Sequence, residues 1–414
     1  MRIALLSTSE STGGAAVVTR RVTEALRSLG HDARMVVLRR DEKQNTDFVE
    51  TAAGNRRGRL LPFVAERGEI FLQNAMNRRD LWKVSTASTG VPVFAHSFVA
   101  EADAIIIGWI CQGYLSLAEI GQICALGKPT VMVMHDQWAM TGICHLPGGC
   151  RRWAEGGRCG NCPLLHGMAW KNDLSRRVWK RKKRLYTANP RLKFVAVSSW
   201  LAERAAESTL LAGRDATVIP NPIALPSPTT VRSNREPMII MGAARLDDDV
   251  KNLPLAIDAL NRLHDSGRAE GAEAVFFGGL RDKSALSGLR MPHRWLGPIS
   301  SAEVTSLMGR GKAVLSTSHF EMLPTTIVEG LANGCVAVAT DSGGQSDIIE
   351  NGVNGMLVAP GDAQGMADAL AWALSDDAPN ARELRMSVEK FDAKSIGARF
   401  LQLLDSLNSK AVGV

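Results

Sequence analysis

The stretch from His319 to Glu350 constrains the fold of this chain more than any other. Two short apolar runs bracket its helical part, Ala313–Ser318 and Cys335–Thr340, and both are typical of strands buried in a parallel sheet. The residues between these runs carry apolar side chains at helical spacing and end at Asn333-Gly334, a common signal for the end of a helix. Strand, helix and strand in this order predict a βαβ unit and therefore an α/β protein.

Two carboxylates, Glu321 and Glu329, lie on this unit with seven residues between them. Glu321 falls in the loop from strand to helix, and Glu329 falls about two turns further along the chain. Pro324 fits the first turn of the helix, whose free N–H groups and partial positive charge suit a phosphate. Because carboxylates accept hydrogen bonds from sugar hydroxyls, this arrangement predicts a nucleotide-sugar ligand.

Two cations, Arg245 and Lys251, follow a strand expected at Met238–Gly242. Cations after a parallel strand are well placed to meet a diphosphate. The intervening Asp247–Asp249 raise the alternative of a divalent metal, but consecutive side chains rarely converge on one ion. The pair therefore strengthens the expectation of a nucleotide site.

The first half of the chain repeats the α/β pattern, with strands expected at Ile3–Ser7, Ala104–Trp109 and Thr130–Met134. After the first strand, Gly13 and Gly14 open a helix in a layout that cradles phosphates, although a plain tight turn explains the glycines equally well. The third strand ends in His135-Asp136. Polar groups at the carboxyl ends of parallel strands often bind ligands, although a single histidine there is more often structural.

Two Rossmann-like domains are expected from this repetition in 414 residues. The first covers residues 1–220, and a segment rich in Pro, Ser and Thr follows it up to Arg235. The second covers residues 221–390. A last helix, at about 391–410, is long enough to cross back onto the first domain.

Four cysteines gather in a segment with few apolar residues: Cys144, Cys150, Cys159 and Cys162. The closing C-x2-C is typical of half a structural zinc site, although the first pair is more widely spaced than usual. His145 or His166 could replace one thiolate, and free or redox-labile thiols are the alternative. We favour a structural zinc and expect that catalysis requires no cofactor, because four thiolates leave no open position on the metal.

The formal net charge of +7 suits an anionic partner, such as a nucleotide or an acidic membrane face. The run Asp173–Tyr186 contains seven Lys or Arg residues, and a helix with a basic rim is expected around Phe63–Met76. Either helix could rest on an anionic membrane, and the helix around Phe63–Met76 could instead line an acceptor cleft. An ordinary solvated helix face is the alternative for both. No fold signal for nucleic-acid binding accompanies them.

The opening run MRIALLS is too short for the apolar region of a signal peptide. No stretch reaches the roughly 18 apolar residues needed to span a bilayer. We therefore expect a cytoplasmic protein that associates at most with the inner face of the plasma membrane.

Together these motifs resemble glycosyltransferase family 4, the retaining enzymes of GT-B fold, in which two Rossmann-like domains face each other across a cleft. The resemblance covers nearly the whole chain and is carried by Glu321-x7-Glu329, the pair Arg245 and Lys251, Val218-Ile219-Pro220-Asn221, Ser342-Gly343-Gly344 and Asn354-Gly355. The segment from His135-Asp136 to Cys144-His145 is similar to a bacterial subset, colanic-acid-type transferases included, that builds cell-surface polysaccharides. Two departures are mild: Asp347 replaces the family's usual Glu, and Pro222 replaces a frequent Gly.

The resemblance implies a role for each matching position. Arg245 and Lys251 would neutralise the donor diphosphate, Glu321 would hold hydroxyls of the donor sugar, and His135 would lie near the reacting carbon; these four are the implied catalytic residues. The implied donor-binding residues are Glu329, which would bind the ribose, together with Gly13, Gly14, Gly242, Leu323, Pro324, Thr325 and Thr326.

The implied function is retaining hexosyl transfer from a UDP- or GDP-sugar to a hydroxyl of a glycan or a lipid-linked oligosaccharide, in the synthesis of exopolysaccharide or another cell-surface glycoconjugate. Two alternatives remain. A GT-B-fold sugar-nucleotide epimerase would need no acceptor, and a non-catalytic nucleotide-sugar-binding partner protein would show no turnover.

Overall fold

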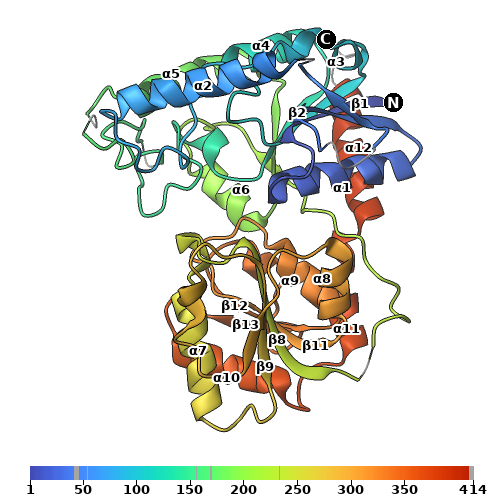
Figure 1. Ribbon diagram of the computed structural model, residues 1–414. Coiled ribbons are helices and arrows are strands. Elements are labelled where there is room, and N and C mark those ends of the chain that lie inside the picture. Colours follow the sequence, from blue (N-terminus) through green and yellow to red (C-terminus); the bar gives the residue numbers. More distant parts are fainter. Residues whose placement is uncertain (42–45, 54, 155, 168–169, 233, 410–414) are drawn as a thin grey trace. The chain divides into compact units, whose positions relative to one another are not determined.

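The chain forms two compact units in the computed structural model, which describes residues 1–41, 46–53, 55–154, 156–167, 170–232 and 234–409 (Figure 1). Unit 1 comprises Met1–Pro222 and the chain from Lys394 on, and unit 2 comprises Ile223–Ala393. The division lies close to the boundary expected at residue 220. Among the described residues, no helix has the length and apolar character needed to cross a membrane.

Unit 1 contains a seven-stranded sheet in the order β3-β2-β1-β4-β5-β6-β7, and all its pairings are parallel. The strands are β1 (Arg2–Ser9), β2 (Asp32–Arg39), β3 (Val49–Thr51), β4 (Ala104–Ile107), β5 (Thr130–Met134), β6 (Lys193–Ala196) and β7 (Ala216–Val218). The central strands consist of buried residues without alternation, as expected where helices cover both faces of a parallel sheet.

Seven helices belong to the described part of unit 1: α1 (Gly14–Ser28), α2 (Arg56–Gln73), α3 (Ser97–Glu101), α4 (Leu117–Ala125), α5 (Leu174–Ala188), α6 (Ser199–Ala206) and α12 (Ala393–Ser409). Short 3-10 turns cover Val93–Ala95 and Trp138–Met140. The last helix, α12, returns to this unit, where Gly397 lies against Ala25 of α1 and Phe400 is almost fully buried.

Unit 2 contains a six-stranded parallel sheet in the order β10-β9-β8-β11-β12-β13. The strands are β8 (Glu236–Arg245), β9 (Glu273–Gly279), β10 (His293–Trp295), β11 (Gly311–Ser316), β12 (Val336–Thr340) and β13 (Gly355–Val358). The helices are α7 (Leu253–Asp265), α8 (Ser301–Met308), α9 (Thr325–Ala332), α10 (Ala363–Leu374) and α11 (Ala381–Met386), with 3-10 turns at Asp249–Lys251, Lys283–Leu286, Gly344–Asp347 and Glu389–Phe391. Two parallel α/β units confirm the expected fold class.

Three expected elements differ from the observed ones. The helix expected around Phe63–Met76 is α2, which begins seven residues earlier at Arg56 because Asn55 caps it, its side chain accepting from the Gly58 amide. The sequence after the glycine turn Ser342-Gly343-Gly344 also predicts a helix from Gln345 to about Glu350, but only the 3-10 turn Gly344–Asp347 forms there. The strand expected over Ala104–Trp109 ends at Ile107, so Trp109 lies on the loop after it.

The basic helix α5 is only partly a solvated face. Lys182 is fully buried, and its ammonium donates to the carbonyls of Trp138 and Thr141 at 2.6 and 3.1 Å. The same ammonium lies 3.4 Å from the centroid of the Trp138 ring, a cation–π contact. Burial lowers the pKa of Lys182 to about 7. This lysine therefore fastens the 138–141 turn to α5, a role that its charge alone did not indicate.

Candidate functional site

Each sheet has a switch point, where two neighbouring strands lead to connections on opposite faces of the sheet. Parallel sheets bind ligands at this point, beyond the carboxyl ends of the strands. In unit 2 that point lies between β8 and β11, and in unit 1 it lies between β1 and β4. Arg245 and Glu321 follow the two strands in unit 2, and Gly13 and Trp109 follow the two strands in unit 1. The candidate site residues therefore gather at these two points.

The loop that carries Lys251 is fixed to the end of β11. The Thr317 hydroxyl donates to the carbonyls of Lys251 and Asn252 at 2.9 and 3.1 Å, and the His319 amide donates to the carbonyl of Val250 at 2.8 Å. Asn252 then enters α7 in the left-handed region, with φ 49°. These bonds hold the backbone of the cation against the loop that carries Glu321.

The structure brings Lys251 and Glu321 into direct contact. The Lys251 ammonium lies 2.6 Å from Oε1 of Glu321, and the Ser318 hydroxyl donates to the same oxygen at 2.8 Å. The two side chains are only 28% and 19% exposed, so the pair is shielded but still reachable by a ligand. Within the described part of the chain both of these bonds go to Oε1, which leaves Oε2 as an acceptor for a hydroxyl donor.

A second set of hydrogen bonds, from residues 342–345, supports the loop that carries Glu321. The Gln345 side-chain amide donates to the Ser342 hydroxyl at 3.1 Å, and that hydroxyl donates to the Ser318 carbonyl at 2.6 Å. Glu321 also forms a backbone bridge with Gly343, and its carbonyl accepts from the Gly344 amide at 2.9 Å. A Cβ at Gly343 would lie 2.1 Å from that carbonyl oxygen, so only glycine fits. Sequence reasoning matched Ser342-Gly343-Gly344 as a motif but did not connect it to Glu321.

Arg245, the other cation expected at the diphosphate, forms ion pairs with two aspartates of its own loop. It ends β8 and pairs with Asp248 at 2.6 Å and with Asp247 at 3.6 Å. The aspartates that suggested a metal are therefore partners of Arg245 and of backbone amides, since Asp247 also accepts from the Arg281 amide at 3.0 Å. Arg245 remains 36% exposed at its side chain.

Helix α9 begins directly after the Glu321 loop, at Thr325, with Pro324 as its N-cap rather than in its first turn. No side chain caps its first amides, among them those of Thr325 and Thr326, and Leu323 before them is buried. Glu329 lies on this helix, half-buried. The helix lies close to β11 because Gly330 has no side chain: a Cβ there would lie 2.5 Å from Val314.

Position 242, expected among the donor-binding residues, is a glycine because neighbouring side chains leave no room for a Cβ. A Cβ at this position would lie 2.0 Å from the ring of Phe277, its partner on β9. Gly13 and Gly14 differ, because a Cβ at either position would meet no atom within 4 Å. Gly13 has φ 90° and caps α1, so its conformation requires glycine while the space above it stays open.

His135 follows β5 and is half-buried. It lines two small adjoining cavities in unit 1, one of them shared with Thr19 and Asn221 and the other with Trp109 and Trp138. Burial lowers the pKa of His135 to about 4, against the opposing effect of the Asp136 charge. Its imidazole is therefore neutral at physiological pH.

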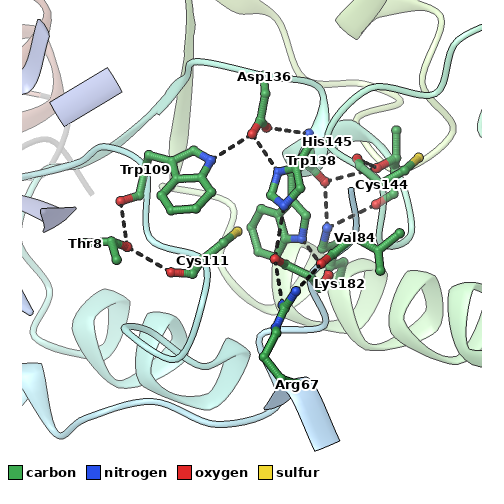
Figure 2. Close-up of polar contacts among 12 residues, drawn as sticks. Thr8, Arg67, Val84, Trp109, Cys111, Asp136, Trp138, Cys144, His145 and Lys182 are labelled. Atoms are coloured by element: carbon green, nitrogen blue, oxygen red, sulfur yellow. Dashed lines mark hydrogen bonds and ion pairs between the residues drawn. The ribbon is translucent and has the colours of Figure 1, made fainter. Parts of the chain in front are cut away.

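Asp136 is the centre of a network that sequence reasoning missed (Figure 2). Its carboxylate accepts from Trp109 Nε1 at 2.8 Å and from the Trp138 amide at 2.8 Å, and it lies 2.7 Å from His145 Nδ1. Although burial opposes ionisation, His145 and these donors together hold the pKa of Asp136 below its usual value. The only signal in the sequence was its place at a strand end beside His135.

The network continues beyond His145. Its Nε2 lies 3.0 Å from the Ser85 hydroxyl, which accepts from Arg67 at 3.3 Å. Both ring nitrogens of His145 are thus occupied, and His166 bonds Asp80 at 2.8 Å. His145 therefore has no ring nitrogen left to replace a thiolate of the expected zinc site, whereas the Asp80 contact of His166 uses only its Nε2.

The four cysteines of the expected zinc site are present as free thiols. Burial raises the pKa of Cys144, Cys159 and Cys162 to about 12 each, and every one of them is raised further by the charge of other cysteines in the set. The Gly142 amide donates to the Cys159 sulfur at 3.3 Å. Among the described residues, no three His, Cys, Asp or Glu side chains are arranged as metal ligands. The zinc site stays a prediction.

Comparison with known proteins decides the family. The family model described as Glycosyltransferase Family 4 matches residues 12–225, and the one described as Glycosyl transferases group 1 matches residues 229–391. The chain belongs to glycosyltransferase family 4. The resemblance seen in the motifs is therefore confirmed.

Two curated relatives and one solved structure illustrate the range of this family. A glycogen synthase of Mycobacterium tuberculosis is 26% identical over 42% of this chain and 43% of its own length. A phosphatidyl-myo-inositol mannosyltransferase of Mycolicibacterium smegmatis is 28% identical over 49% of this chain and 55% of its own. The chain thus spans about half the length of these relatives.

The structure of Anabaena Alr3699/HepE in complex with UDP and glucose is 18% identical, with a TM-score of 0.61 over 98% of this chain and all of that one. This likeness confirms the expected GT-B class for the family 4 chain.

The low pKa of His135 gives a prediction for stability against pH. The pKa of His135 is about 4 in the folded state and near the ordinary histidine value of 6.5 in the unfolded state, so between these values the unfolded state binds more protons. The free energy of unfolding should therefore decrease as the pH falls from about 6.5 to about 4. Urea unfolding across this range should show a smaller decrease for His135→Gln than for the wild type. The control is His264→Gln, at an exposed position on α7, which should keep the wild-type slope. Equal slopes for all three proteins would contradict the prediction.

Proposed function

We propose that this protein is a retaining hexosyltransferase that moves a sugar from a UDP- or GDP-sugar to a hydroxyl acceptor. The observation that carries the proposal is the contact of Lys251 with Glu321 at the switch point of unit 2. A cation for a diphosphate and a carboxylate for sugar hydroxyls lie side by side there, and the unbonded amides of α9 follow directly in the chain. Family membership supports the same chemistry.

In the proposed reaction, the bond between the anomeric carbon and the diphosphate oxygen breaks, and the acceptor oxygen bonds that carbon and passes its proton to the departing diphosphate. Negative charge grows on the departing diphosphate. Lys251 and the α9 amides would stabilise that charge, and Glu321 would orient the sugar through its free Oε2. The Thr317 and Ser318 bonds hold these groups in place before the donor arrives, so little reorganisation is needed.

Arg245 would join the diphosphate site only after its bond to Asp248 is exchanged for one to phosphate. The exposed position of this ion pair makes the exchange inexpensive in free energy. Glu329 is proposed to bind the ribose, and His135, neutral and half-buried, is proposed to lie near the acceptor. Gly13 and Gly14 leave open space above the start of α1 for ligand atoms.

The shielded Lys251–Glu321 pair favours catalysis over non-catalytic binding. A carrier of nucleotide sugars needs no cation held at the position where the leaving group gains charge. An epimerase would release free nucleotide without any acceptor, and a binding protein would show a donor-induced thermal shift without turnover. Acceptor-dependent release of nucleoside diphosphate distinguishes the proposal from both.

We further propose a glycan or lipid-linked oligosaccharide acceptor in exopolysaccharide or related cell-surface synthesis, at the cytoplasmic face of the membrane. An exposed apolar surface on α2 supports this proposal. Leu60, Leu61, Val64 and Leu72 are 50%, 66%, 54% and 63% exposed. Exposed cations on α5, among them Lys180, Arg181 and Arg184, complement it, and Gln73 of α2 bonds Arg177 of α5 at 2.6 Å. Apolar and basic groups side by side suit an anionic bilayer.

Substitution of the donor site tests the central proposal. Lys251→Ala and Glu321→Ala should each lower kcat at least about 10²-fold, because each removes a group aimed at the reacting charge or sugar. Donors would first be selected by thermal shift against a panel of UDP- and GDP-sugars. The control is Arg262→Ala, which removes an exposed cation from its pair with Asp258 on α7 and should leave kcat unchanged. Near-normal turnover in both site variants would reject the assignment.

Vesicle sedimentation tests the membrane proposal. Wild-type protein should bind phosphatidylcholine vesicles that contain phosphatidylglycerol, and it should bind pure phosphatidylcholine vesicles more weakly. The double variant Leu61→Ser, Leu72→Ser should weaken binding about tenfold or more, since it removes two exposed apolar side chains. Matched changes at Val353 and Met386 of unit 2, 50% and 53% exposed, should have no effect. Equal binding by both double variants would rule out α2 as the contact.

Metal analysis tests the structural zinc. Protein purified without chelator should contain about one zinc per chain, and the double variant Cys159→Ser, Cys162→Ser should contain none. Chelation of the wild type should lower its melting temperature, because bound metal stabilises the folded state. Cys124→Ser, outside the cluster, should keep the metal. Wild-type protein without stoichiometric zinc would mean that the cysteines are plain thiols.

A further inference from the structure

Trp109 lies at the switch point of unit 1, and no sequence motif assigned it a role. It follows β4 at the switch point, beside the loop that follows β1. Its carbonyl accepts from the Thr8 amide at 2.8 Å and from the Thr8 hydroxyl at 3.1 Å, which ties the ends of β1 and β4 together. Gly108 before it has no room for a side chain, since a Cβ would lie 2.8 Å from Thr19. The backbone of Trp109 is therefore held rigidly at the edge where parallel sheets bind ligands.

The indole of Trp109 is held as firmly as its backbone. Its Nε1 donates to Oδ2 of Asp136 at 2.8 Å, and its ring lies 5.6 Å from the His145 ring at an angle of 36°. Figure 2 shows Trp109 and His145 reaching the Asp136 carboxylate from different sides. The ring plane is thus fixed, and its only polar atom is already bonded.

Asp136, which binds the indole of Trp109, is held in place by further hydrogen bonds. The Trp138 amide bonds the other oxygen of Asp136 at 2.8 Å, and Trp138 Nε1 donates to the Ser85 carbonyl at 2.9 Å. Ser85 in turn contacts His145, at 3.0 Å. This network of partly buried bonds fixes both the position and the plane of the Trp109 indole. It is the support expected for an aromatic group that must present a fixed surface to a ligand.

A fixed aromatic ring with its N–H satisfied can offer a ligand only apolar and π surface. Pyranose rings carry axial C–H groups on one face, and these pack against aromatic rings while the hydroxyls at the rim find polar partners. Trp109 lines a small cavity together with His135 and Asp136, so polar groups stand next to the indole. Trp109 itself is neither buried nor fully exposed, so part of its ring remains open to contact.

We infer that Trp109 is a stacking platform for a pyranose ring, the sugar unit of the acceptor that receives the transferred hexose. Asp136 and His145 act as positioning residues that hold the indole plane. The inference rests on the proposed function, since that function supplies the sugar acceptor. It adds a residue that determines which ring, and which face of it, is presented for reaction.

Saturation-transfer difference NMR on the full chain tests the platform. The probes are methyl β-D-glucopyranoside, methyl β-D-galactopyranoside and methyl α-D-mannopyranoside. At least one should receive saturation from the wild type, strongest at the axial protons of one face. Trp109→Ala and Trp109→Leu should weaken its binding about tenfold, whereas Trp109→Phe, which keeps an aromatic ring, should remain within about threefold. Trp170→Ala, at a position 49% exposed, is the control and should bind as the wild type does.

Two results would overturn the inference: no saturation of any probe by the wild type, or wild-type binding by a folded Trp109→Ala or Trp109→Leu variant. Should the alanine variant fail to fold, the leucine variant, which keeps an apolar side chain, decides. Thermal shifts with UDP-glucose and GDP-mannose on the same samples separate this inference from the proposed function. Probe binding that depends on Trp109, in a protein that responds to no nucleotide sugar, would support the platform and reject the transferase.

Discussion

Parallel strands all end at the same edge of their sheet, and this constraint governs both candidate sites. Residues distant in the sequence meet only because each follows a strand on that edge. Lys251 and Glu321 are 70 positions apart, yet their charged atoms lie 2.6 Å apart. In unit 1, the same geometry brings the end of β1 to the end of β4 and places Trp109 beside Asp136. Chemistry then depends on side chains in loops, while the buried strands hold these loops in position.

Local spacing made much of this organisation predictable. Apolar runs of strand length, a glycine after a helix and two glutamates with seven residues between them are patterns within a single βαβ unit. They were sufficient for the α/β class, for a site with Glu321 and Lys251, and for the family. Helix limits were less accurate, because Asn55 starts α2 earlier than the apolar pattern does and because the segment after Gly343 closes into a 3-10 turn.

Side-chain partners set by long-range packing were not predictable. Lys182 belongs to a run of cations and looks like part of a solvated face, but it is buried against Trp138. Trp109 has no motif at all, and its importance depends on Asp136, which is 27 positions away. The contact partner of each side chain is set by the tertiary fold, and it cannot be read from the spacing of residues in the sequence.

The position of Glu321 depends on a residue that has no functional group. Gly343 lies so close to the Glu321 backbone that any side chain would displace the loop. A genome search for this chemistry that requires only the two glutamates would therefore also accept chains whose loop cannot hold the first glutamate in position. A search that also requires a glycine against the backbone of the first glutamate, as Gly343 is in this chain, would exclude such chains.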